Sequence, residues 1–187
     1  MTPVEANQLL DKLQAGDVSR DAVLRAFQAA PVADLGFAQV DQHRALRCGF
    51  PEVVYGAGKT PGQIIEIALS ILERSDQLLI TRVDAEQAAF AVEKLPGAIL
   101  HEMARCVTVE KTPLPRRAGT IAVLCAGTSD MPVAEEAAVT AEIMGNHVKR
   151  IYDVGIAGLH RLLAQTDTLR QANVTIAVAG MEGALPS

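Results

Sequence analysis

The chain has 187 residues, of which 49% are hydrophobic and 21% charged, a length and balance sufficient for a folded core. Its formal net charge is -5 and only 3% of its residues are aromatic, which disfavours a general nucleic-acid surface or a stacking platform for single strands. Without an apolar leader or an apolar run of about 18 residues, we expect a cytoplasmic protein with no membrane partner. The widely spaced Cys48, Cys106 and Cys125 disfavour a zinc site or a disulfide framework.

Two amphipathic helices are predicted first, over Val4–Gln14 and Ser19–Ala30, with Gly16 between them. Ser19 is the expected cap of the second helix, and Pro31 follows its end. Such a hairpin is typical of packing or of subunit contact rather than of a ligand site.

Short strands and helices alternate next, which predicts a mostly parallel sheet. Thr60 is expected to cap a helix that begins at Pro61, and Asp84–Lys94 is a second helix candidate. The strand candidates of this part are Phe37–Val40, Pro51–Tyr55, Leu78–Thr81, Ala98–Leu100 and Cys106–Val109.

The segment Lys111–Arg117, with two prolines and three basic residues, interrupts this alternation. We therefore place a linker at 113–117, after an N-terminal α/β domain at 1–112 that begins with the helical hairpin. The C-terminal part, 118–187, is predicted as a β-α-β-α-β series. Its strands are Thr120–Leu124, Val148–Tyr152 and Val174–Ala179, and its helices are Pro132–Met144 and Ala157–Arg170.

Right-handed crossovers make that series a partial doubly wound, flavodoxin-like parallel sheet, so the fold class is α/β. Three strands form a small sheet. We expect N-terminal elements or another subunit to cover it, or the chain to be a truncated part of a longer one.

Gly127-Thr128-Ser129-Asp130 directly follows the first strand of that series, where ligands of open α/β sheets bind. Gly127 allows close approach of a ligand to the backbone, and Thr128 and Ser129 offer hydroxyl groups. Asp130 is expected either to cap the next helix or to hold a ribose hydroxyl.

Two further loops follow the other strands of the series. Gly180 precedes Glu182, which is expected to act as a general base or to be a solvated turn residue. The segment that begins at Asp153 contains His160, which either faces the pocket or lies on the surface of the helix.

A charged group lies between two predicted strands of the N-terminal part, with Asp41, Arg44, Arg47 and Lys59 as its main members. Arginine pairs well with carboxylate and phosphate groups, although a solvated charged loop has the same composition. The Gly56-Ala57-Gly58-Lys59-Thr60 stretch is not a Walker loop, because Val53 stands where that motif needs glycine.

The C-terminal loops resemble the phosphoribosylaminoimidazole (AIR) carboxylase family, which has a Gly-Ser-x-Ser-Asp loop here and a histidine where this chain has Glu182. The chain from about residue 30 to its end resembles a more specific group, the carboxylases of nickel-pincer nucleotide biosynthesis (LarB). This second resemblance rests on Asp34–Asp41, Arg44, Arg47, Gly49–Thr60, Thr81–Val83 and Gly180–Ser187.

The resemblance implies an enzyme that carboxylates the pyridinium ring of nicotinic acid adenine dinucleotide with carbon dioxide or bicarbonate. It then hydrolyses the phosphoanhydride, releasing AMP and pyridinium biscarboxylic acid mononucleotide. No covalently bound cofactor or resident metal is implied, magnesium is compatible, and a homo-oligomer is expected. The family's nucleophilic cysteine falls past Ser187, so we expect a truncated chain that does not activate the ring by itself.

The resemblance also assigns roles to residues. Catalytic roles are expected for Glu182, Ser129 and Asp130, and substrate binding for Asp41, Arg44, Arg47, Lys59, Gly127, Thr128, His160 and Gly180. Two alternatives stay open: an AIR carboxylase-like enzyme acting on an aminoimidazole ribotide, and a non-catalytic nucleotide-binding or assembly module.

Overall fold

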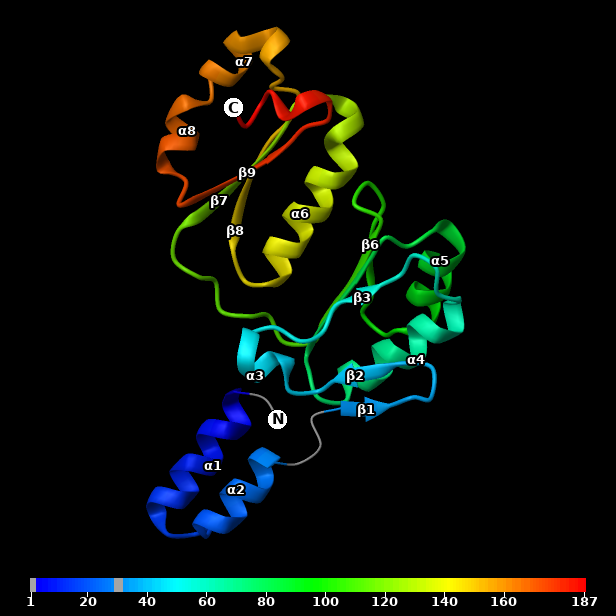
Figure 1. The fold of residues 1–187 in the computed structure, drawn as a ribbon, viewed down its shortest axis with the longest axis vertical. Helices are drawn as coiled ribbons and strands as arrows, with labels where there is room; N and C mark the ends of the chain where they lie inside the picture. The colour runs from blue at the N-terminus through cyan, green and yellow to red at the C-terminus, as the bar shows by residue number, and fades with distance from the viewer. Residues whose placement is uncertain (1–2, 29–31) are drawn as a thin grey trace.

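The computed structural model describes residues 3–28 and 32–187 (Figure 1). Helices α1 (Pro3–Ala15) and α2 (Arg20–Gln28) form the predicted hairpin, which extends from one end of the molecule. The hydroxyl of Ser19 accepts a hydrogen bond of 3.2 Å from the Ala22 amide, which confirms the predicted cap. The last two residues of the predicted second helix, and Pro31 after it, lie outside the described residues.

The N-terminal unit contains a small ribbon and a four-stranded sheet. Strands β1 (Val32–Asp34) and β2 (Gln39–Asp41) pair antiparallel, and the short helix α3 (Arg44–Cys48) follows. The larger sheet has the order β3-β4-β6-β5. Its strands are β3 (Val54–Tyr55), β4 (Gln77–Thr81), β5 (Ile99–His101) and β6 (Cys106–Glu110).

The prediction that this sheet is mostly parallel is wrong, because only β3 and β4 pair parallel while β4–β6 and β5–β6 pair antiparallel. A short turn over residues 102–105 joins β5 to β6, and so short a connection allows only an antiparallel hairpin. Strand β6 then enters the sheet between β5 and β4.

Two capped helices cover one face of this sheet. In α4 (Pro61–Leu72) the Thr60 hydroxyl accepts from the Gln63 amide at 3.2 Å, and the Gln63 side chain accepts from the Thr60 amide at 3.0 Å. Asp84 and Gln87 form the same capping box at α5 (Ala85–Lys94). Both predicted helix starts are therefore confirmed.

The C-terminal unit is a three-stranded parallel sheet of order β8-β7-β9, as predicted. Its strands are β7 (Thr120–Cys125), β8 (His147–Ile151) and β9 (Val174–Val178). The single helix predicted over 157–170 is instead α7 (Leu159–Leu163) and α8 (Thr166–Gln171), preceded by a 3-10 turn. The Thr166 hydroxyl, which donates to the Leu163 carbonyl at 2.6 Å, competes with helical pairing at the break.

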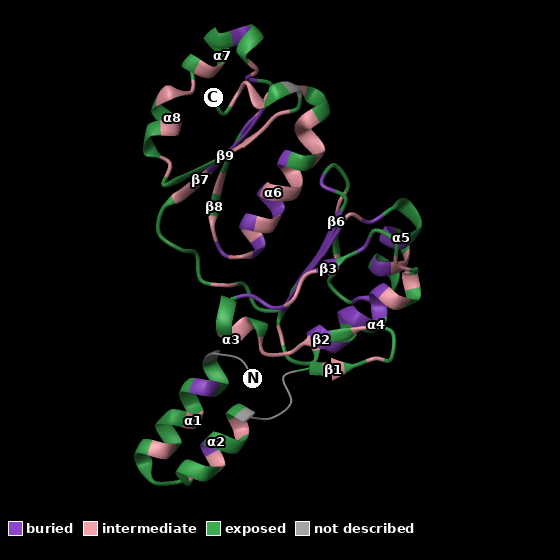
Figure 2. Ribbon diagram, in the orientation of Figure 1, coloured by how far each residue is buried: buried purple, intermediate pink, exposed green. Residues whose placement is uncertain are grey.

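Helix α6 (Met131–Ile143) lies between the two sheets (Figure 1). Its Ala134 and Ala138 pack on Val123 and Cys125 of the C-terminal sheet. Its Val139 and Ile143 belong to a second cluster with Leu79 and Cys106 of the N-terminal sheet. Elements of both units therefore share this helix, and Figure 2 shows the buried strands on either side of it. The opposite face of the C-terminal sheet meets Leu162, Leu169 and Ala172, so helices lie on both faces, as a doubly wound sheet requires.

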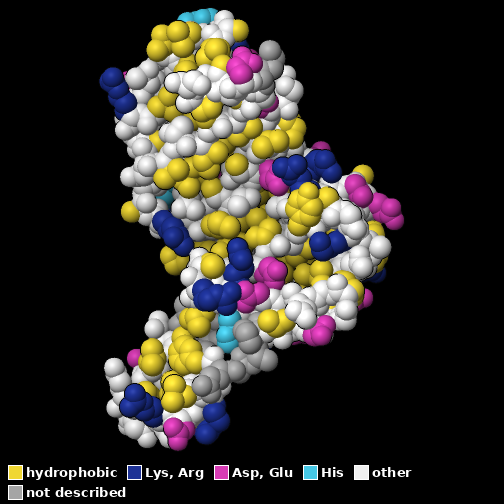
Figure 3. Space-filling model, in the orientation of Figure 1, with side chains coloured by type: hydrophobic (Ala, Val, Ile, Leu, Met, Phe, Trp, Pro, Cys, Tyr) yellow, Lys and Arg dark blue, Asp and Glu magenta, His cyan; other side chains and the backbone are white. Residues whose placement is uncertain are grey.

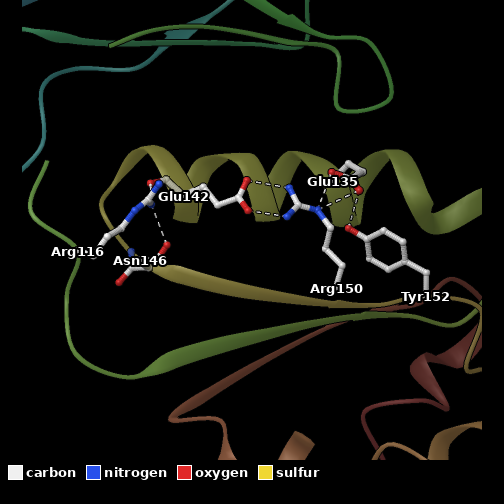
Figure 4. A network of polar contacts seen from close by, with 6 residues as sticks. All are labelled: Arg116, Glu135, Glu142, Asn146, Arg150 and Tyr152. Atoms are coloured by element: carbon white, nitrogen blue, oxygen red, sulfur yellow. Dashed lines mark hydrogen bonds and ion pairs between the residues drawn. The ribbon is translucent and has the colours of Figure 1, made fainter. Parts of the chain in front are cut away.

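A polar network fastens α6 to β8 (Figure 4). The Arg150 guanidinium contacts Glu142 at 2.5 and 2.8 Å and both carboxylate oxygens of Glu135 at 3.2 Å. The hydrogen bond to Glu142 raises the pKa of Arg150, and burial together with the 2.9 Å bond to Glu135 raises the pKa of Tyr152. The network therefore holds α6 against β8. No described helix has the length and apolar character needed to cross a bilayer.

Candidate functional site

Parallel order places the carboxyl ends of β7, β8 and β9 at one edge of the sheet, which we call the C-edge. The loops that meet there are 126–130, 152–158 and 179–183. The Ala126 amide donates to the Val178 carbonyl at 3.1 Å, and the Gly155 amide donates to the Ala126 carbonyl at 2.9 Å. The first loop is therefore in direct contact with the second loop and with the end of β9.

The first loop is closed by its own aspartate. The Gly127 amide donates to Asp130 Oδ2 at 3.0 Å across a 3-10 turn, η1 (Thr128–Asp130). Asp130 makes no side-chain cap on α6, so its carboxylate holds the loop rather than the helix. Thr128 and Ser129 are exposed on this turn, where their hydroxyls can accept or donate to a ligand.

The third loop brings Gly180 beside Asp130. A Cβ built on Gly180 would lie 3.8 Å from Asp130 Oδ1, so the two loops adjoin. Glu182, within the turn η3 (Met181–Gly183), is exposed and has φ 42, a left-handed conformation that non-glycine residues rarely adopt. Its carboxylate has no hydrogen-bond or ion-pair partner among the described residues. Backbone strain of this kind is found at functional sites more often than elsewhere.

The second loop contains an ion pair that the sequence did not predict. Asp153, with φ 58, pairs with Arg161 of α7. The sequence places both partners in the segment Asp153–Arg161, whose Gly155 and Gly158 suggest close backbone approach, but it does not predict that they pair. His160, predicted to bind substrate, is exposed on α7 beside Arg161.

The charged group of the N-terminal unit lies elsewhere. Asp41 accepts from the His43 amide at 3.0 Å and pairs with Arg47, and its own amide donates to Glu52 at 2.6 Å. Partial burial by itself raises the pKa of Asp41, but the hydrogen bonds from Arg47 and the His43 main chain outweigh it and lower that pKa. Arg44 is exposed at the first position of α3. Asp41 thus fixes the start of α3.

Lys59 is also engaged locally, since its Nζ donates to the Tyr55 carbonyl at 2.8 Å and lies 6.0 Å from the Tyr55 ring centre. Figure 1 shows α3 and β3 well separated from the loops that follow β7, β8 and β9. Within one chain the structure therefore gathers Gly127, Thr128, Ser129, Asp130, Gly180 and Glu182 at the C-edge. It does not bring Asp41, Arg44, Arg47 or Lys59 to them.

None of the three cysteines offers a reactive thiol at the C-edge. Cys125 ends β7 with no exposed surface, and burial raises its pKa. Burial likewise raises the pKa of Cys106 to about 12. Cys48 is exposed but lies on α3. Within 3–28 and 32–187 no group of three or more His, Cys, Asp or Glu residues could hold a metal ion.

Comparison with known proteins gives the family. Residues 32–111 match the LarB/PurE-like N-terminal domain. Over 194 aligned positions the chain is 36% identical to an uncharacterised protein of Methanocaldococcus jannaschii, with 96% of this chain and 73% of that relative covered. The chain belongs to the LarB/PurE-like family. The predicted resemblance is thereby confirmed, and the family indicates a carboxylase-type enzyme.

Proposed function

We propose that the protein acts in the synthesis of pyridinium biscarboxylic acid mononucleotide, carboxylating nicotinic acid adenine dinucleotide and hydrolysing its phosphoanhydride. The observation that supports this most is the C-edge itself, where Thr128, Ser129, Asp130 and an unpaired, strained Glu182 come together on contacting loops. Membership of the LarB/PurE-like family supports ring carboxylation as the reaction in which these groups take part.

The proposed roles follow from the geometry of the loops. The exposed hydroxyls of Thr128 and Ser129 bind phosphate or ribose oxygens, and the backbone at Gly127 and Gly180 leaves room for the ligand to approach. Glu182 removes the ring proton after carbon dioxide has added, because it is the exposed carboxylate of the cluster without a partner in the described chain. Asp130 keeps the first loop in shape while its second oxygen faces Gly180.

Ring activation in this family uses a cysteine thiolate, and the buried Cys106 and Cys125 are poor candidates for it. The decisive experiment incubates this chain, and a form extended past Ser187, with the dinucleotide and isotopically labelled bicarbonate. Mass spectrometry should find labelled mononucleotide and AMP from the extended form. In that form Glu182→Gln should lower the rate roughly 100-fold or more while dinucleotide binding persists. Absence of product from both forms would count against the carboxylase.

A second candidate is a nucleotide-binding module without turnover, favoured by one observation: the C-edge presents hydroxyls and carboxylates but no accessible thiol. It predicts tight dinucleotide binding with no labelled product from either form. Substituting an aminoimidazole ribotide for the dinucleotide in the same assay tests the AIR carboxylase-like reaction.

A further inference from the structure

A hollow beside α5 in the N-terminal unit, which we call the α5 hollow, has the features of a small-molecule site. Its volume is about 500 Å³, and ligand pockets usually measure roughly 300–1,000 Å³. Its apolar lining consists of Val83, Ala85, Ala88, Ala89 and Leu100. No C-edge loop contributes to it, and Figure 1 shows α5 well apart from α7 and from the C-terminal end of the chain.

The sequence of α5 explains why this space is open. Ala85, Ala88 and Ala89 are three and four positions apart, so their methyl groups share one face of the helix. Leu100 of the edge strand β5 and Val83, which follows β4, complete the apolar lining. Because an alanine side chain ends at Cβ, the helix fills little of the space, and a face of methyl groups suits a flat apolar body.

Arg105 gives the hollow a cation that is already held in place. Its carbonyl accepts from the Val83 amide at 3.0 Å, and its Nε donates to the Val83 carbonyl at 3.1 Å. Its Nη1 and Nη2 have no partner within residues 3–28 and 32–187. Arg105 has φ 50, a left-handed conformation that glycine adopts more readily. A fixed guanidinium with two unengaged N–H groups is suited to a carboxylate, whose two oxygens match that pair.

Two carboxylates also line the hollow, so its charge does not favour a simple anion. Asp84 caps α5 through Gln87, and the exposed Glu102 side chain makes no ion pair or hydrogen bond within the described chain. Figure 3 shows further acidic side chains at the outer end of the N-terminal unit, at the right of the view. A ligand with a carboxylate for Arg105 and a positive charge for Glu102 and Asp84 balances both signs.

We propose that the α5 hollow binds an N-substituted pyridinium carboxylate, with its carboxylate on Arg105 and its positively charged ring beside Glu102 and Asp84. The ring lies against the alanine face of α5. The charges and shape of the hollow give the class of ligand, a flat zwitterion, and the choice of a pyridinium ring rests on the proposed function. This site is additional to the C-edge, to which the proposed function assigns the chemistry.

An NMR titration of the full chain with three probes tests the proposal. N-methylnicotinate carries both the ring cation and the carboxylate. N-methylnicotinamide keeps the cation without the carboxylate, and benzoate keeps the carboxylate without the cation. N-methylnicotinate should shift the amide signals of Val83, Ala85, Ala88 and Arg105, and it should bind more tightly than either of the other probes.

Arg105→Gly tests the carboxylate contact. It removes the guanidinium and relieves the left-handed backbone, so the variant should stay folded. It should weaken N-methylnicotinate by roughly 10-fold to 100-fold, the usual effect of losing a charged hydrogen bond. Arg82→Gly is the matched control, because Arg82 has φ 55 but does not line the hollow, and it should bind as the unchanged chain does.

Two further variants separate shape from charge. Ala89→Leu places a larger side chain in the hollow at an exposed position of α5, and it should abolish binding without loss of stability. Glu102→Gln should weaken N-methylnicotinate by about 2-fold to 5-fold and leave benzoate unweakened, because it removes only the attraction to the ring cation.

The outcomes also distinguish this site from the proposed function. Absence of shifts, equal binding of benzoate and N-methylnicotinate, or unaltered affinity in Arg105→Gly overturns the site. Shifts confined to the C-edge loops overturn it as well, while they agree with the proposed function. Binding in the α5 hollow that depends on Arg105, by a protein that gives no labelled product in either form, supports this inference and counts against the proposed function.

Discussion

Replacement of Gly155 by alanine tests whether the contact between the first two C-edge loops shapes the site. Gly155 has φ -59 and ψ 155, a conformation that alanine adopts without strain, so only the contact is tested. The added Cβ would lie 2.8 Å from the Ala126 carbonyl oxygen and 3.4 Å from its carbon. Both atoms are backbone atoms of the residue after the buried strand β7, so the clash cannot be relieved by a rotamer change.

The expected cost has two parts. Overpacking of this kind costs about 1–3 kcal/mol. Separation of the loops also weakens the 2.9 Å hydrogen bond from the Gly155 amide to Ala126, which contributes about 0.5–1.5 kcal/mol. We therefore expect Gly155→Ala to lower the free energy of unfolding by about 2–4 kcal/mol.

Urea denaturation followed by circular dichroism measures this difference. Gly62→Ala is the matched control, because no atom lies within 4 Å of the Cβ it would add in α4. That control should be neutral or should stabilise the chain by about 0.4–1 kcal/mol. If Gly155→Ala unfolds at the same urea concentration as the unchanged chain, the backbone of Gly155 does not lie in close contact with Ala126.

Three further predictions concern stability. Thr60→Ala removes the capping box of α4 and should cost about 1 kcal/mol by urea denaturation, whereas Thr60→Ser should cost much less; equal losses would contradict the cap. Arg150→Ala leaves Glu135 and Glu142 of α6 without their shared cation and should cost about 1–2 kcal/mol by thermal denaturation, discounted for 32% side-chain exposure. Burial raises the pKa of the Cys106 thiol from its usual 9.0 to about 12 in the folded protein. Above pH 9.0 the thiol is therefore deprotonated in the unfolded chain but still protonated in the folded one. The free energy of unfolding should then fall with rising pH by at most about 1.4 kcal/mol per pH unit, a slope that should flatten in Cys106→Ala.

Local chemistry in the sequence determined much of the fold. Thr60 before Pro61, and Asp84 before an alanine-rich run, predict helix starts that the structure confirms, because capping depends on residues within one turn. The uninterrupted apolar run of β7 predicts a buried parallel strand, since both faces of such a strand meet helices. The position of the first and third loops at one sheet edge also follows from alternation of strands and helices alone.

Only the tertiary structure decided the features that depend on residues far apart in the chain. The entry of β6 between β5 and β4, and the position of α6 between two sheets, follow from which apolar faces are best buried together. The sequence could not show that the charged residues near Asp41 lie far from the C-edge. The charge and spacing of residues do not specify the distance between two structural units. The pairing of Arg161 with Asp153 likewise needs the loop after β8 to fold back over Gly158, and that path is set by contact with β7 rather than by local preference.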